Sequence, residues 1–339
     1  MPAKNPVAPA IARLQEFLRE RELDANQVVP LTPDASTREY FRINWTSGTA
    51  IACVYPEPFQ TDALPFLDVT NLFLRSTLPV ATVYEVSGEL GVVIHEDFGD
   101  KVLRDYLAAA SEDEQETQLE RAIELIAEIQ AVTERAFQLD SIASRLAFDE
   151  EKLGWELNYF QTHYFGSLRG ETLSDEDKQN LQNELDDVVR ELAARPRVLC
   201  HRDYHAANLM IDRHGKLRII DHQDARMGPA SYDLVSLLLD RVSEPPSPAW
   251  VREKRLFFLE ERRRLGLETL DPDDFASEFR LMTVQRCLKA VGTFSYQTAV
   301  RHRTNYEQYI NPMLKIVDQT AEYLNRFPTL QKIIKERVQ

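Results

Sequence analysis

The segment VLCHRDYHAANLMIDRHGKLRIIDHQDA, residues 198–225, decides how the chain is interpreted. Asp203 lies in a polar loop that follows a short apolar run, and Asn208 stands at the start of a second apolar run. Asp221 ends a third apolar run. The turn sequence Asp212–Gly215 between the last two runs predicts a β-hairpin. We therefore expect the hairpin to bring Asn208 and Asp221 to the same end of the sheet.

These residue types suit the transfer of a phosphoryl group. Such a reaction needs a carboxylate that orients the acceptor hydroxyl and takes its proton. It also needs hard oxygen ligands for a Mg²⁺ ion that bridges the nucleotide phosphates, and carboxylates and carboxamides supply them. The string His201-Arg202-Asp203-x-x-x-x-Asn208 fits the catalytic-loop pattern H-R-D-x-x-x-x-N. Each of the three polar residues could also be a turn or cap residue, but their shared spacing favours the functional interpretation.

The segment resembles the aminoglycoside/choline kinase superfamily of small-molecule phosphotransferases more than it resembles a protein kinase. Asp221 is followed by His222-Gln223 instead of Phe-Gly, and GPASYDLVSLL comes soon after. The resemblance extends along most of the chain. PDASTREYFR is similar to the nucleotide loop, HEDFGD to the hinge, and VQRCLKAVGTFS to a late helix of the branch that contains N-acetylmuramate/N-acetylglucosamine anomeric kinases.

The resemblance implies an α+β, protein-kinase-like fold with two lobes. Residues 1–98 would form a small antiparallel-sheet lobe that binds the nucleotide, and residues 99–339 a large, mostly helical lobe for catalysis and acceptor binding. Asp203 would be the catalytic base and contact the acceptor, while Asn208 and Asp221 would bind Mg²⁺. The expected reaction is the ATP-dependent phosphorylation of the anomeric hydroxyl of an amino sugar, as in cell-wall recycling.

The expected nucleotide site departs from the kinase pattern at one point. The strand TAIACVYPEP lacks the lysine that usually holds the α- and β-phosphates, and the chain has no G-x-x-x-x-G-K-[ST] loop. Arg38 and Arg42 are the nearest cations, and they share a strand face. The hydroxyls of Ser36 and Thr37 could help to hold phosphate, although they could also cap a turn. The resemblance adds the hinge residues to the adenine side of this site: Glu96, Asp97 and Phe98.

Two further residues are candidates for substrate binding. Asp224 is an extra carboxylate three residues after Asp221, and it could equally be a turn residue before Gly228. Arg286 and Lys289 lie away from the apolar stripe of a predicted helix. We predict that Arg286 meets an anionic group of the substrate, although most such residues are simply solvated.

Composition excludes several classes of protein. The 339 residues carry 40 Lys+Arg and 55 Asp+Glu, a net charge of −15, which argues against a broad nucleic-acid interface. Apolar runs are too short to cross a membrane. The three cysteines are widely separated and form no disulfide framework, so we expect reduced thiols in the cytoplasm. Beyond a nucleotide and a small-molecule acceptor, no obligate protein partner is expected.

Two other functions remain open at the level of sequence. One is a phosphotransferase for a cationic acceptor such as an aminoglycoside or choline, whose pocket should present carboxylates or aromatic rings. The other is a nucleotide-binding pseudokinase, because the strand lysine is missing.

Periodicity predicts the arrangement of the elements. An amphipathic helix at 8–22, which would bury Ile11, precedes a hairpin, a helix at 61–78 and two more strands. Helices should then dominate, at 101–136, 149–165, 173–194, 248–266, 274–301 and 305–326.

Overall fold

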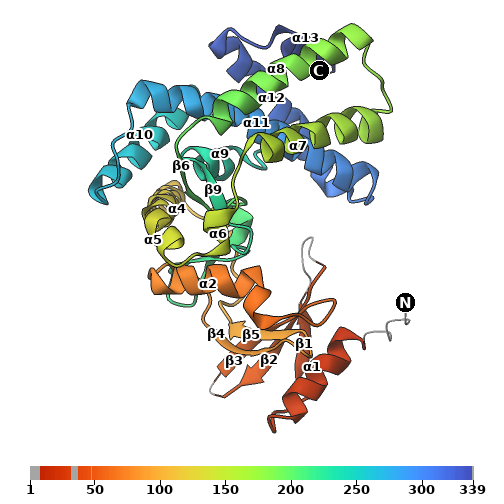
Figure 1. The fold of residues 1–339 in the computed structure, drawn as a ribbon, viewed down its shortest axis with the longest axis vertical. Coiled ribbons are helices and arrows are strands. Elements are labelled where there is room, and N and C mark those ends of the chain that lie inside the picture. Colours follow the sequence, from red (N-terminus) through yellow and green to blue (C-terminus); the bar gives the residue numbers. More distant parts are fainter. Residues whose placement is uncertain (1–7, 32–36, 47, 338–339) are drawn as a thin grey trace. The chain divides into compact units, whose positions relative to one another are not determined.

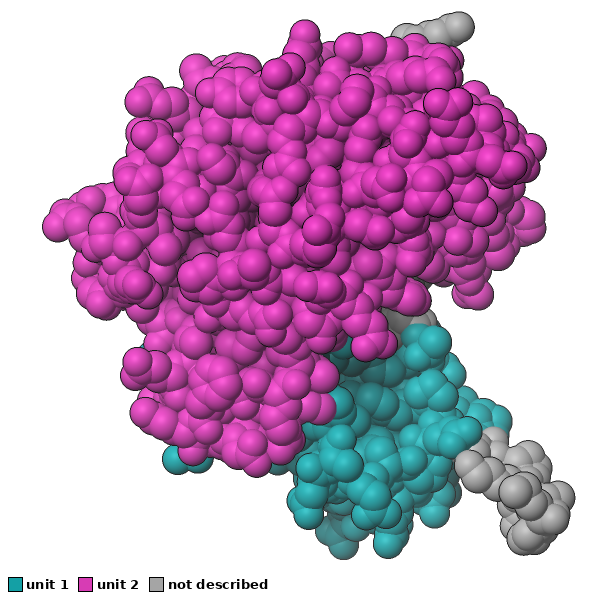
Figure 2. Space-filling model, turned by 45° about the horizontal axis from the view of Figure 1, so that its top comes forward, with its two compact units in different colours: residues 1–109, 207–224 teal, residues 110–206, 225–339 magenta. Residues whose placement is uncertain are grey.

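The computed structural model describes residues 8–31, 37–46 and 48–337. The chain divides into two compact units, coloured separately in Figure 2. The first unit comprises residues 1–109 and 207–224, and the second comprises residues 110–206 and 225–339. The segment 207–224 therefore belongs with the N-terminal part of the chain, although about a hundred residues of the second unit precede it in sequence.

A five-stranded antiparallel sheet forms the centre of the first unit (Figure 1). Its strand order is β1-β2-β3-β5-β4. Alternation of side chains in β2 sends Phe41 and Ile43 to one face and Tyr40 and Arg42 to the other. The strands are β1 (Val28–Leu31), β2 (Glu39–Trp45), β3 (Gly48–Val54), β4 (Val83–Ser87) and β5 (Val92–Glu96).

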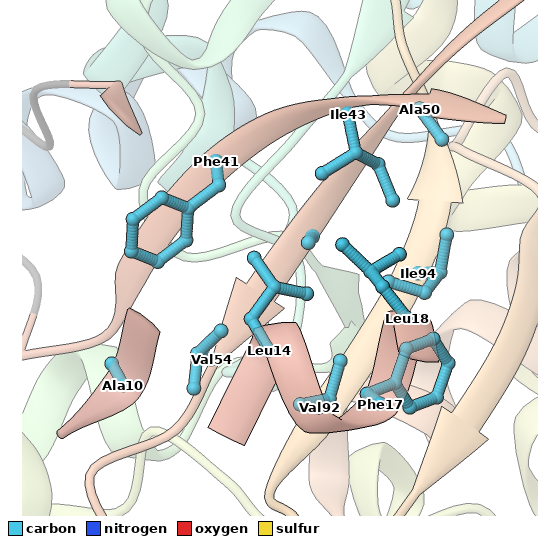
Figure 3. Close-up of a cluster of buried hydrophobic side chains, with 11 residues drawn as sticks. Ala10, Leu14, Phe17, Leu18, Phe41, Ile43, Ala50, Val54, Val92 and Ile94 are labelled. Atoms are coloured by element: carbon cyan, nitrogen blue, oxygen red, sulfur yellow. The ribbon is translucent and has the colours of Figure 1, made fainter. Parts of the chain in front are cut away.

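The helix α1 (Ala10–Arg19) covers one face of this sheet (Figure 3). Leu14, Phe17 and Leu18 are fully buried there, and burial of each such side chain contributes roughly 1.5–3 kcal/mol. Arg13 fixes the helix by donating hydrogen bonds to the carbonyl oxygens of Leu90 and Tyr55, both at 2.6 Å. Ile11, expected in the buried stripe, is instead 38% exposed, because the contact with the sheet is made by the neighbouring face of the helix.

The opposite face of the sheet packs against the 3₁₀ turn η1 (Thr61–Ala63) and the helix α2 (Pro65–Arg75). Cys53, Leu64 and Val93 form the buried centre of this contact. The expected helix at 61–78 is thus divided, because a proline starts the α-helix proper. The hairpin of β7 (Leu209–Ile211) and β8 (Leu217–Ile219) completes the unit, through a bridge between Val80 and Ile219.

The second unit is mostly helical, and one long helix lies at its centre. This helix, α11 (Pro272–Ala299), packs against α7, α8, α9 and α12 (Figure 1). Gly292 permits the closest approach, because a Cβ there would lie 2.7 Å from the Cα of Phe160. The other long helices are α4 (Glu112–Ala131), α7 (Glu150–Phe160), α8 (Asp175–Ala193), α9 (Tyr232–Leu239), α10 (Pro248–Arg264), α12 (Ile310–Leu324) and α13 (Pro328–Arg337).

Several boundaries differ from those that periodicity predicts. The expected helix at 101–136 is three helices: α3 (Leu103–Leu107), α4 and α5 (Thr133–Gln138). Ser111 and Glu114 form a capping box that starts α4 anew. The expected helix at 149–165 is α7 followed by a π-helix, η2 (Gln161–Arg169). The strands β1 and β9 (Arg226–Pro229) and the helix α13 were not predicted.

The strand β6 (Arg197–Cys200) pairs with β9 in a short antiparallel sheet. The start of the segment 198–225, up to residue 206, therefore belongs to the second unit. Within the described ranges, no helix has both the length and the apolar surface that crossing a membrane requires.

Candidate active site

The loop that follows β6 is held by a buried carboxylate. Asp233, at the start of α9, is fully buried and accepts hydrogen bonds from the backbone N–H groups of His201 at 2.6 Å and Arg202 at 3.0 Å. Arg202 has a φ of 87°, a strained value for a residue with a side chain. Such strain persists only where surrounding bonds fix the backbone, and it is concentrated at functional sites. Asp233 therefore positions the loop that presents Asp203.

Positive charges surround the carboxylate of Asp203 within the second unit. The Nζ of Lys289 donates a hydrogen bond to its Oδ1 at 3.1 Å. Guanidinium nitrogens of Arg202 and Arg286 lie 3.7 and 3.8 Å from its oxygens. Burial would raise the pKa of Asp203, but Lys289, Arg202 and Arg286 outweigh it and hold the pKa well below its usual range. Asp203 is thus ionised, and its side chain remains 26% exposed.

Arg286 lies behind Asp203 and is itself nearly buried, at 3% exposure. It donates hydrogen bonds to the hydroxyl oxygens of Ser236 at 2.7 Å and Tyr232 at 3.2 Å, and it pairs with Asp240 at 3.4 Å. The expectation that it lies away from the buried face of its helix is wrong, because these partners enclose it. The structure leaves the prediction of substrate binding by Arg286 untested.

A second polar group lies beside this cluster, on α7 and α11. Gln285 donates a hydrogen bond to the buried Glu156 at 2.9 Å, and Lys152 lies 3.9 Å from the same carboxylate. Burial lowers the pKa of Lys152; Glu156 opposes this effect, and the positive charges of Arg202 and Lys289 add to it. Sequence reasoning missed this group, whose only signal is the i,i+4 spacing of Lys152 and Glu156.

Asn208 and Asp221 lie together in the first unit, as the hairpin predicts. The backbone N–H of Ile220 donates to the carbonyl oxygen of Asn208 at 3.1 Å, which closes the mouth of the hairpin. The side-chain nitrogen of Asn208 then lies 3.5 Å from the carboxylate of Asp221. Asp221 has a φ of 62°, again a strained value, and its side chain is 41% exposed.

The donor set at the mouth of the hairpin fits a magnesium ion. It offers an exposed carboxylate and an amide whose oxygen can turn toward the same point, and both are hard oxygen ligands. Mg²⁺ keeps most of its six positions for water and phosphate oxygens, so two protein ligands suffice. Asp221 and Asn208 are the residues that would hold the ion.

His222 ties this end of the hairpin to α2. Its Nε2 lies 2.7 Å from the hydroxyl of the buried Thr70. Its ring centroid is 5.4 Å from those of Phe66 and Phe73. The imidazole thus packs near two phenylalanine rings next to Asp221 and fixes that end of the hairpin.

Arg38 and Arg42, both candidate cations for the nucleotide phosphates, have different partners. A guanidinium nitrogen of Arg38 lies 3.4 Å from Asp221, and the group lies near the rings of Tyr40 and Tyr55. Arg38 also acts electrostatically on the buried thiol of Cys53, in the strand that lacks lysine. The positive charge of Arg38 thus lies next to Asp221, a candidate ligand of Mg²⁺.

Arg42 binds carboxylates of the hinge segment, residues 95–100. It donates to Asp97 at 2.7 Å and to Asp100 at 2.8 Å. Asp97 also accepts hydrogen bonds from the Thr49 hydroxyl at 2.7 Å and the Gly99 N–H at 2.9 Å. Burial of Asp97 would raise its pKa, but the hydrogen bonds from Arg42, Thr49 and Gly99 outweigh burial and keep the pKa below its usual value.

The neighbouring hinge side chains are also engaged. Glu96 lies 3.3 Å from Arg218, whose guanidinium carbon lies 4.8 Å from the ring centroid of the buried Phe98. Thr37 is exposed, Asp224 is half-buried in the loop after β8, and Ser36 lies outside the described residues. None of these positions tests the predicted contacts with nucleotide or substrate.

Comparison with known proteins identifies the family. Residues 27–267 match the model of the phosphotransferase enzyme family. The N-acetylmuramate/N-acetylglucosamine kinase of Neisseria meningitidis serogroup B is 29% identical over 330 residues, which cover 95% of this chain and 94% of the relative.

Solved structures confirm the predicted fold. A microcompartment-associated aminopropanol kinase superposes with a TM-score of 0.64 at 16% identity, covering 93% of this chain and 98% of the other. An ADP-bound aminoglycoside phosphotransferase gives a TM-score of 0.56 at 14% identity, with coverage of 93% and 99%. The α+β, protein-kinase-like architecture and the resemblance drawn from residues 198–225 are thus both confirmed. The chain belongs to the phosphotransferase enzyme family.

Proposed function

We propose that this chain is a kinase that transfers the γ-phosphoryl group of ATP to the anomeric hydroxyl of N-acetylmuramate or N-acetylglucosamine. The observation that carries the proposal is the ionised carboxylate of Asp203, fixed in a strained loop and left partly exposed. The name of the Neisseria relative supports the choice of acceptor.

In the proposed reaction, Asp203 accepts the proton of the anomeric hydroxyl while the sugar oxygen bonds to the γ-phosphorus. The bond from that phosphorus to the bridging oxygen breaks, and ADP leaves. A carboxylate with a depressed pKa is a weak base, so orientation of the hydroxyl is its main contribution. An anomeric hydroxyl is more acidic than an ordinary alcohol, which suits such a base.

The donor side of the reaction would use residues of the first unit. Mg²⁺, when bound by Asn208 and Asp221, would neutralise charge on the transferring phosphates. Arg38 would take the role of the absent strand lysine, because it is the cation beside Asp221. We retain the division into a nucleotide-binding lobe, residues 1–98, and a catalytic and acceptor-binding lobe, residues 99–339, as part of the proposal.

Charge near Asp203 favours a neutral or anionic acceptor over a cationic one. Lys289, Arg286 and Arg202 lie within 4 Å of the carboxylate. A site for an aminoglycoside or choline should instead gather carboxylates or aromatic rings around the acceptor. All three cysteines are free and buried, which supports a reducing compartment such as the cytoplasm.

The test is Mg²⁺-dependent release of ADP from the full chain, with N-acetylglucosamine, N-acetylmuramate, kanamycin and choline as separate acceptors. We expect the two amino sugars to stimulate release and to yield sugar 1-phosphates. Asp203→Asn should lower kcat at least a thousandfold while the Kd for ATP changes little.

Three results would contradict the proposal. Stimulation by kanamycin or choline alone would assign a cationic acceptor. ATP binding without stimulation by any acceptor would favour a pseudokinase. Full turnover in Asp203→Asn would remove that residue from its role.

A further inference from the structure

The second unit contains a cavity that the proposed reaction does not use. Its volume is about 140 Å³, and it lies where α10, α11 and α12 meet the segment between α9 and α10. Most of the lining is apolar, and Pro246, Phe279, Ile316 and Tyr323 contribute to it. An apolar cavity of roughly 150 Å³ accepts a molecule the size of benzene.

One charged side chain that lines this cavity has two buried nitrogen donors without a hydrogen-bond partner. The Nε and Nη1 atoms of Arg255 are buried, and neither has an acceptor. Buried donors that are left without an acceptor are unfavourable, because they lose the hydrogen bonds that water would supply. A guanidinium stays charged in proteins, so the cost cannot be avoided by losing a proton.

The charges near Arg255 add to this deficit. Burial lowers the pKa of Arg255, the charges of Arg280 and Arg252 lower it further, and Tyr323 opposes them. No carboxylate of the described residues is among the groups that act on it. Arg280 also lines the cavity and stacks over the ring of Tyr323, with its guanidinium carbon 3.9 Å from the centroid. In a chain of net charge −15, this is a local excess of positive charge.

We propose that the cavity binds a small organic oxyanion, with a carboxylate or phosphate head on Arg255 and an apolar body of about benzene size against Phe279 and Ile316. A planar guanidinium binds either head group through two parallel hydrogen bonds. The apolar walls distinguish such a ligand from an inorganic ion, which would gain nothing from them.

This site is distinct from the candidate active site. Neither Asp203 nor the residues that contact it line the cavity. Phe279 and Thr283 line it from the part of α11 that precedes Arg286. Binding here is therefore expected to persist in Asp203→Asn and with the sugar site saturated.

The experiment measures the binding of benzoate, phenyl phosphate, benzamide and inorganic phosphate to the full chain by calorimetry. We expect benzoate or phenyl phosphate to bind at least tenfold more tightly than both benzamide and inorganic phosphate. The tighter of the two identifies the preferred head group. Arg255→Gln should weaken that binding at least tenfold, whereas Arg263→Gln, at an exposed position of the same helix, should leave it unchanged.

Several outcomes would overturn the proposal: no binding by either aromatic anion, equal binding by benzamide or inorganic phosphate, or displacement by N-acetylglucosamine or ATP. Unchanged affinity in Arg255→Gln would do the same. Folding of that variant is checked by its unfolding temperature, which should equal or exceed that of the parent because two buried donors without acceptors are removed. If it fails to fold, Arg280→Gln replaces it and should weaken binding at least threefold.

Discussion

At the scale of single residues, the surroundings of Asp203 determine when it is ionised. Lys289 is its nearest cation, at 3.1 Å, and acts together with Arg202 and Arg286. A carboxylate whose folded-state pKa is depressed stays charged as the pH falls, until the pH approaches that lowered value. Each neighbouring cation therefore widens the pH range in which the loop can orient a hydroxyl.

Replacement of Lys289 by methionine should narrow that range from the acid side. Loss of the positive charge raises the pKa of Asp203, so the carboxylate becomes protonated at a higher pH. The acid limb of kcat/KM, followed down to the lowest pH at which the chain stays folded, should move upward by about one unit. Lys315→Met, at an exposed position of α12, is the control and should keep the parent profile. An acid limb that does not move in Lys289→Met would rule out this electrostatic role.

Lys152 offers a test of how the two amino sugars are distinguished. N-acetylmuramate carries a lactyl carboxylate that N-acetylglucosamine lacks, and the positive groups near Lys152 favour an added anion. We expect Lys152→Met to raise KM for N-acetylmuramate about tenfold and to change KM for N-acetylglucosamine less than twofold. The neutral sugar is the internal control, and equal effects on both would contradict the assignment.

Replacement of Arg38 should affect the binding of ATP, whereas replacement of Arg42 should affect the stability of the fold. Arg38→Met should raise KM for ATP at least tenfold, because it removes the cation beside Asp221. Arg42→Met leaves the 5%-exposed carboxylate of Asp97 without its ion pair, which should cost about 1–3 kcal/mol of stability. Steady-state kinetics at saturating sugar and urea unfolding separate the two effects. The same rise in KM for ATP in both variants would contradict this difference between the two arginines.

At the scale of elements, close packing of α7 against α11 depends on one glycine. A Cβ at Gly292 would lie 2.7 Å from the Cα and 2.8 Å from the N of Phe160, so the backbone must shift. Phe160 is the last residue of α7 before the π-helix η2, which continues along α11. The contact that fixes Lys152 and Glu156 beside Gln285 is thus built on this approach.

Gly292→Ala should therefore destabilise the protein by about 1–3 kcal/mol, in line with overpacking of a core. Gly154→Ala in α7 is the matched control, because a Cβ there meets nothing within 4 Å. Alanine at that helical position should leave stability unchanged or raise it by up to about 1 kcal/mol. Urea unfolding of both variants is the measurement, and equal stabilities would show that the helices separate at no cost.

Elements whose signals lie in neighbouring residues could be predicted from the sequence. Contacts between elements that are far apart in the sequence could not. The β7–β8 hairpin follows from two apolar runs and a four-residue turn, so Asn208 and Asp221 were predicted together. The break before α4 also had a local signal, the Ser111–Glu114 capping box, which periodicity alone overlooks. Lys289 contacts Asp203 only because α11 packs beside the catalytic loop, and Lys152 comes close to the charges there only because α7 packs on α11. No spacing in the sequence reports either contact.

At the scale of the whole molecule, charge is unevenly distributed. The chain carries a net charge of −15, yet cations gather beside Asp203 and again beside Arg255. Overall acidity therefore argues against a broad nucleic-acid surface without determining the sign of any one pocket. Composition correctly indicated a globular chain with its own core, while the charge of each pocket depends on which helices meet there.

The return of residues 207–224 to the first unit has a consequence for synthesis on the ribosome. At 5–20 residues per second, on the order of ten seconds separate the emergence of residue 109 from that of residue 224. During that interval the carbonyl oxygens of Pro79 and Lys101 still lack the N–H groups of Ile219 and Ile211. The segments that precede β4 and follow β5 thus keep two backbone acceptors open until β7 and β8 have been translated.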